Sequence, residues 1–126
     1  MKAVSREILL GFWKAHILHH AADGALHGHW ILTELRRHGY DISPGTLYPL
    51  LQRMARLGWL KGRVDPRGGR RARRDYQLTA KGRKVLAMVR DKIKELYEEV
   101  VLEAHAAKAS SRKKTSNQSP RKPVLD

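Results

Sequence analysis

Residues 43–54 read SPGTLYPLLQRM, and this stretch decides the fold. Its apolar residues recur at steps of three and four, which predicts an amphipathic helix. They are Leu47, Leu50, Leu51 and Met54, followed by Leu57. Ser43 is a favourable helix cap, and Pro44 suits the first helical position. A second proline, Pro49, then falls inside the predicted helix, where it removes the N–H that would bond to the carbonyl of Gly45.

The opposite face of this helix is polar and predicts a partner outside the chain. It carries Thr46, Tyr48, Gln52, Arg53 and Arg56. Such a helix fits the major groove of DNA, where Thr46, Tyr48 and Gln52 would reach base edges or phosphates. Its N-terminal N–H groups would suit a phosphate. On a DNA-facing side, Pro49 would cost little and permit close approach; the alternative is that Pro49 only kinks a buried helix.

Outward from this helix, the spacing predicts helices over about residues 5–22, 27–37 and 43–57. Gly39 and Gly58 end the second and the third. Two runs with a period of two then follow, WLKGRV at 59–64 and RDYQL at 74–78, and they predict a β-hairpin. Three helices and a hairpin, in a mainly α chain, indicate a winged helix-turn-helix. We therefore expect a DNA-binding domain over residues 1–78.

The tip of the hairpin is rich in arginine and glycine. The residues expected to form this DNA-binding wing are Arg67, Gly68, Gly69, Arg70, Arg71, Arg73 and Arg74. The chain has 126 residues, a net charge of +14 and a pI near 10.7, which favours a polyanionic partner. Residues 43–76 contain nine arginines and lysines but only two acidic residues, both aspartates. This placement predicts double-stranded DNA as the partner, with phosphates gripped by the wing.

A last helix is predicted from a cap at Thr79 to about Ala104, with the spacing of a coiled-coil seam. Its seam residues are Leu86, Val89, Ile93, Leu96 and Val100. The seam is too short to act alone, so Phe12 of the first helix is expected to extend a homodimer interface. A dimer predicts a pseudo-palindromic DNA site. We therefore expect a dimerisation helix over residues 79–106 and a disordered, basic tail over 107–126.

Several classes of protein are excluded by what the sequence lacks. It has no cysteine, which excludes thiol catalysis and disulfides. No triad, glycine-rich phosphate loop or carboxylate pair is present, so we expect no enzymatic activity and no cofactor. The apolar run ILLGFWKAHIL, interrupted by Lys14 and His16, is too short to span a bilayer. It also lacks the features of a signal peptide, so a cytoplasmic protein without a membrane partner is expected.

Histidines and tryptophans supply weaker candidate sites. Six of the seven histidines lie between residues 16 and 38, and His16 and His20 are one helical turn apart, a spacing that can bind Zn²⁺ or Ni²⁺. Because Asp23 is the only well-placed carboxylate, packing or surface roles are favoured and no metal is predicted. Trp13 is the candidate for a pocket that stacks on a planar effector, and the alternative is core packing.

Four segments together resemble the PadR family of bacterial transcriptional regulators: LHG at 26–28, SPGTLYPLL at 43–51, GWL at 58–60 and GGRRARRDYQLTAKG at 68–82. The resemblance implies a winged-helix homodimer that usually represses transcription. In several members a small aromatic or drug-like molecule releases the DNA. By motif, it places Ser43, Gly45, Thr46, Tyr48 and Pro49 on the recognition helix and Gly68 to Arg71 on the wing. His29 and Trp30 stand where members commonly have tyrosine and an acid.

The predicted function is a sequence-specific transcriptional regulator, most simply a homodimeric repressor. Two other functions fit the same composition. A nonspecific, nucleoid-type DNA-binding protein would use the basic tail, and a protein-interaction module would use the last helix.

Overall fold

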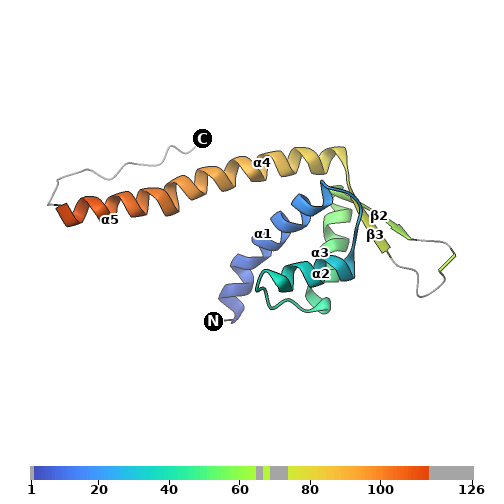
Figure 1. Cartoon of the computed structure of the whole chain (residues 1–126). Helices are drawn as coiled ribbons and strands as arrows, with labels where there is room; N and C mark the ends of the chain where they lie inside the picture. The colour runs from blue at the N-terminus through green and yellow to red at the C-terminus, as the bar shows by residue number, and fades with distance from the viewer. Residues whose placement is uncertain (1, 65–66, 69–73, 114–126) are drawn as a thin grey trace. The chain divides into compact units, whose positions relative to one another are not determined.

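The computed structural model describes residues 2–64, 67–68 and 74–113, in two compact units that meet at the Val89–Arg90 bond. Figure 1 shows the order of the elements. They are α1 (Lys2–Ala21), β1 (Leu26–His27), α2 (Gly28–Arg37), α3 (Pro44–Arg56), β2 (Leu60–Val64), β3 (Arg74–Leu78), α4 (Ala80–Leu96), the π-helix η2 (Tyr97–Glu103) and α5 (Ala104–Lys113). The predicted winged helix-turn-helix, mainly α with a small hairpin, is confirmed.

The core of the first unit is built by one face of each of its first three helices. The buried residues are Ile17 and Leu18 of α1, Ile31 and Leu35 of α2, and Leu47, Leu50, Leu51 and Met54 of α3. Leu57, predicted on the same apolar face, is the C-cap of α3 and is 39% exposed, so the prediction is wrong for this residue. Burial of large aliphatic side chains contributes about 1.5–3 kcal/mol each. Gly39 and Gly58 end α2 and α3 at positive φ, as predicted. This packing turns the polar face of α3 outward.

The start of α3 differs in detail from its prediction. Ser43 occupies the N-cap position, but its hydroxyl makes no capping bond and instead donates to Thr46 Oγ1 at 3.3 Å. Pro44 lies in the first turn, as predicted. Pro49 lies inside the helix and is exposed, which favours the predicted outward position over the alternative that it only kinks a buried helix.

The sheet has three antiparallel strands in the order β1-β3-β2. The predicted strands match β2 and β3, and Gly62 pairs with Tyr76 at their centre. Strand β1 was missed, because His27 was placed in the second helix. A strand of two residues has no detectable period and depends on its partner β3, where His27 lies opposite Asp75 and pairs with its carboxylate.

The helix after Thr79 is capped as predicted, since the Gly82 N–H donates to Thr79 Oγ1 at 2.9 Å. It becomes a π-helix over Tyr97–Glu103 and continues as α5 to Lys113, past the predicted end near Ala104. The predicted disorder is therefore wrong for residues 107–113, where alanine, lysine and arginine favour a helix. Residues 114–126 lie outside the described residues. No helix within the described ranges is long and apolar enough to cross a membrane.

Candidate nucleic-acid interface

The outward face of α3 collects the residues predicted to read DNA. Ser43, Gly45, Tyr48, Pro49, Gln52, Arg53 and Arg56 are exposed, and Thr46 is half-buried. The opposite face is held by Leu47, Leu51 and Met54, none of which has measurable exposure. The helix is therefore anchored on one side and presents polar groups on the other. No part of the predicted recognition face packs into the core of the first unit.

A shallow groove joins this face to the hairpin. Gln52, Ala55 and Arg56 of α3 form one wall. Gly62 of β2, with Arg74 and Tyr76 of β3, forms the other wall. Arg56 and Arg74 thus approach one hollow from two elements. The polar face of α3 and the base of the hairpin form a single continuous surface, which we call the α3–hairpin surface.

The structure describes only part of the predicted wing. Arg67, Gly68 and Arg74 are exposed. Gly69, Arg70, Arg71 and Arg73 lie outside the described residues. The direction of the arginine-rich tip therefore stays a prediction, while its two strands are placed beside α3.

Two contacts at this surface have no signal in the local sequence. Arg6 of α1 donates from Nη2 to Thr46 Oγ1 at 3.2 Å, which adds a cation near the start of α3. The ring of Tyr48 lies over Gly28, where an added β-carbon would come within 2.6 Å of Tyr48 Cε1. Gly28 belongs to the LHG motif, so its small size is now explained by the aromatic ring above it.

The residues predicted for a dimer interface divide between the two units. Leu86 is only 4% exposed and packs in the core of the first unit, so its assignment to a partner is wrong; Val89 is half-buried against that core. In the second unit Ile93, Leu96 and Val100 are exposed apolar residues. Phe12 of α1 is also exposed. Four of the six residues thus remain available for a partner as predicted, and Val89 is available in part.

Trp13 lies in the core rather than beside an open pocket. It is 4% exposed and meets Tyr40 edge to face, with ring centroids 6.3 Å apart. Its indole Nε1 is buried and has no hydrogen-bond partner among the described residues. This placement favours the alternative of core packing for Trp13.

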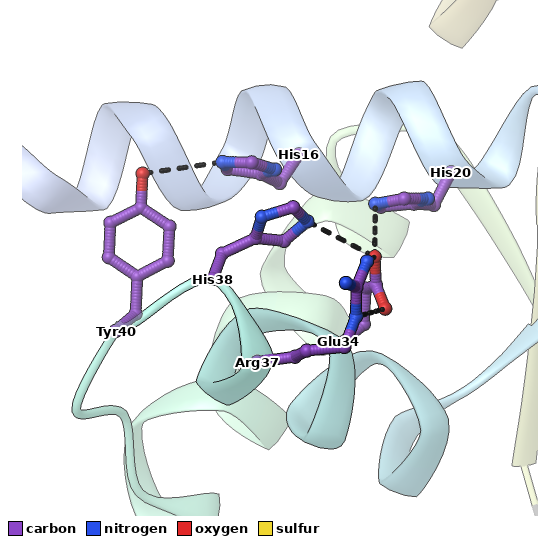
Figure 2. Close-up of polar contacts among 6 residues, drawn as sticks. All are labelled: His16, His20, Glu34, Arg37, His38 and Tyr40. Atoms are coloured by element: carbon purple, nitrogen blue, oxygen red, sulfur yellow. Dashed lines mark hydrogen bonds and ion pairs between the residues drawn. The ribbon is translucent and has the colours of Figure 1, made fainter.

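Histidines of two helices form a cluster away from the α3–hairpin surface, and we call it the histidine cluster: His16 and His20 of α1 with His38, the C-cap of α2. Figure 2 shows the two α1 rings reaching toward His38 and Glu34. One ligand atom of each histidine lies within 4.8 Å of the others. Glu34 was missed as a neighbouring carboxylate, and the expectation that only Asp23 was well placed is wrong.

Glu34 is the central acceptor of this region. Its Oε2 lies 3.1 Å from His38 Nε2 and 3.7 Å from His20 Nε2, and Arg37 binds both its oxygens. The hydrogen bond from Arg37 lowers the pKa of Glu34 to about 2. Burial, followed by the neighbouring His38, lowers the pKa of His16, and burial followed by His19 lowers the pKa of His20. Burial thus disfavours the charged form of both imidazoles.

Comparison with known proteins agrees with this geometry. Residues 17–88 match the profile of the transcriptional regulator PadR-like family. The transcriptional regulator Rv3488 of Mycobacterium tuberculosis is 47% identical over 96 residues, which cover 76% of this chain and 89% of that protein. A PadR family regulator from Eggerthella lenta has a TM-score of 0.67 at 28% identity, covering 79% of this chain and 87% of that one. For a PadR-like regulator from Bacillus cereus the TM-score is 0.62 at 26% identity, with coverage of 80% and 95%.

Proposed function

The chain belongs to the PadR-like family of transcriptional regulators, and on that basis we propose that it is a sequence-specific, homodimeric repressor that binds a pseudo-palindromic duplex. Members of this family are DNA-binding regulators rather than enzymes, in agreement with the predicted absence of catalysis. The observation that carries the proposal is the α3–hairpin surface, where Gln52 and Arg56 of a recognition helix share one groove with Arg74. The expected cytoplasmic location stays a prediction.

Each part of this surface has a distinct role in the proposal. Tyr48 and Gln52 read base edges in the major groove. Arg53, Arg56 and Arg74 bind phosphates on either side of that groove. The start of α3 has no side-chain cap and lies near the cation of Arg6, a combination that favours a phosphate. The exposed ring of Pro49 permits close approach of the backbone to the duplex.

Binding to selected and scrambled duplexes tests the proposal. Bound sequences are selected from a random pool, and affinity is measured by fluorescence anisotropy at several salt concentrations. We expect the selected duplex to bind at least about 10³-fold tighter than a scrambled one. Log K should fall linearly with log salt, with a slope of about −0.9 for each phosphate neutralised. Equal affinity for both duplexes would identify a nucleoid-type protein instead. The absence of salt-dependent DNA binding would favour a protein-interaction module.

Gln52→Ala separates base reading from phosphate binding. We expect it to weaken binding to the selected duplex by about 10–100-fold, since a good bidentate base contact contributes about 1–3 kcal/mol. Affinity for the scrambled duplex should stay unchanged. The matched control is Gln77→Ala, because Gln77 is exposed on the face of β3 opposite Arg74 and Tyr76. An equal loss in both variants would contradict the assignment of α3 as the reading helix.

Release of the DNA by a small aromatic or drug-like molecule is proposed from the family resemblance. Trp13 is buried, which leaves the exposed Trp30 as the better aromatic platform. Its ring meets His20 edge to face at 5.3 Å, and both residues line a hollow with Asp23 and His27. An exposed indole at the edge of a hollow can stack on a planar ligand.

A further inference from the structure

The histidine cluster has no role in the proposed reading of DNA, and its chemistry points elsewhere. Three imidazoles from two helices converge within 4.8 Å, and Glu34 adds a carboxylate that already contacts two of them. We propose that His16, His20, His38 and Glu34 form a binding site for a divalent transition-metal ion, Zn²⁺ or Ni²⁺, between α1 and the end of α2. The proposal needs no DNA contact and is independent of the proposed function.

The distances are close to those that a tetrahedral ion requires. With metal–nitrogen bonds of about 2.0–2.1 Å, neighbouring ligand atoms in a tetrahedron lie roughly 3.4 Å apart. The separations from Glu34 Oε2 to His38 Nε2 and to His20 Nε2, 3.1 and 3.7 Å, lie on either side of that value. The wider spacing among the three histidines would close by side-chain rotation, above all of His38, whose side chain is 40% exposed.

The ligand set selects the class of ion. Neutral imidazoles suit zinc, nickel and copper, whereas calcium and magnesium require mostly oxygen ligands. A metal binds the neutral form of an imidazole, and burial lowers the pKa of both His16 and His20. The Tyr40 hydroxyl lies 3.3 Å from His16 Nε2, so this contact would be exchanged for the metal or moved to the other ring nitrogen.

Arg37 is the competitor for this site. Its guanidinium holds both oxygens of Glu34, and its positive charge opposes a bound cation. The Arg37 side chain is 66% exposed, however, whereas that of Glu34 is only 13% exposed. Arg37 can therefore turn into solvent when a metal takes its place, while Glu34 stays beside the histidines. Removal of Arg37 should strengthen metal binding or leave it unchanged.

A second group, His19, His20 and Asp23, has similar spacing but a poorer environment. His19 and His20 are adjacent at the end of α1, Asp23 lies in the turn that follows the helix, and His19 and Asp23 are exposed. Such a group joins no second helix and excludes little water. We therefore assign the site to the histidine cluster and treat the second group as an outcome of the test.

Calorimetric titration of Zn²⁺ into the untagged, chelator-treated full chain is the experiment, with Co²⁺ absorption in the visible range as a measure of tetrahedral coordination. We expect one ion for each chain. His16→Gln, His38→Gln and Glu34→Gln should each weaken affinity by about 10–100-fold or more, because losing a ligand costs at least as much as losing an outer-shell partner. The matched control is His29→Gln, an exposed histidine of α2 outside both groups.

The outcomes separate the alternatives. Weakening by His38→Gln with no effect of His19→Gln supports the site. Weakening by His19→Gln alone would overturn it in favour of the second group. Unchanged affinity in all variants, or no heat above that of buffer, would also overturn it and leave the cluster as a hydrogen-bonded network between two helices. Melting curves without metal check that each variant is folded.

Discussion

Gly82→Ala lowers the free energy of unfolding by about 3 kcal/mol, at the upper end of the range for overpacked sites. Gly82 is buried at the start of α4, and an added β-carbon would lie 2.1 Å from the carbonyl oxygen of Trp59 and 2.6 Å from Leu78 Cδ1. The first of these atoms belongs to the backbone that leads into β2 and cannot turn away. Thr79 fixes the same region, since its hydroxyl donates to the carbonyls of Gly58 and Trp59.

The measurement is thermal or urea unfolding followed by circular dichroism, at one fixed protein concentration. A loss of 3 kcal/mol corresponds to a fall in Tm of roughly 12–24 °C, at about 4–8 °C for each kcal/mol in a domain of this size. Gly11→Ala is the control, because Gly11 lies in α1 and a β-carbon there meets nothing within 4 Å. It should stabilise the helix by about 0.5–1 kcal/mol. Similar effects of the two substitutions would refute the steric argument.

Local periodicity explains why much of this fold could be predicted. The buried face of α3 repeats every three or four residues, and β2 and β3 alternate between their two faces, so both patterns can be read within a few residues. Glycines at the ends of α2 and α3 mark positive φ angles for the same local reason. The outward position of the polar face of α3 could also be predicted, because the opposite, apolar face had to be buried.

Features that depend on tertiary contact were not predictable from these patterns. A two-residue strand such as β1 exists because β3 lies beside it. The approach of Arg6 to Thr46 joins residues forty positions apart. Glu34 and His38 are one turn apart on α2, but only the packing of α1 against α2 brings them to His16 and His20. Spacing within one helix identifies half of such a cluster and says nothing of the other half.

Apolar periodicity also does not tell a chain's own core from a partner's surface. Leu86 and Leu96 both lie on the predicted seam, yet Leu86 is 4% exposed and Leu96 is 57% exposed. The difference arises because the first turns of α4 belong to the first unit and pack against its core, whereas residues 90–100 are all exposed. A stripe of apolar residues that includes Ile93, Leu96 and Val100 is therefore exposed in the second unit, and this exposure supports the proposed homodimer.

Leu96→Asp tests this surface, and we expect it to raise the dimer dissociation constant by about 100-fold or more. Truncation of a central apolar anchor costs about 2 kcal/mol or more, and the aspartate would add a charge that has to be desolvated at the interface. Sedimentation equilibrium measures the change directly. Affinity for the selected duplex should fall with it, since a monomer contacts only one half-site.

Leu102→Asp makes the same chemical change six residues further along the second unit, at another exposed leucine. Six residues span about 1.7 turns of an α-helix and fewer turns of the wider π-helix η2, so Leu102 does not lie directly above Leu96. Leu102 thus lies off the stripe, and its substitution should leave the dimer intact. Dissociation by Leu102→Asp but not by Leu96→Asp would move the interface to the other side of the helix. If neither substitution acted, the exposed Phe12 of α1 would become the principal candidate for the contact between subunits.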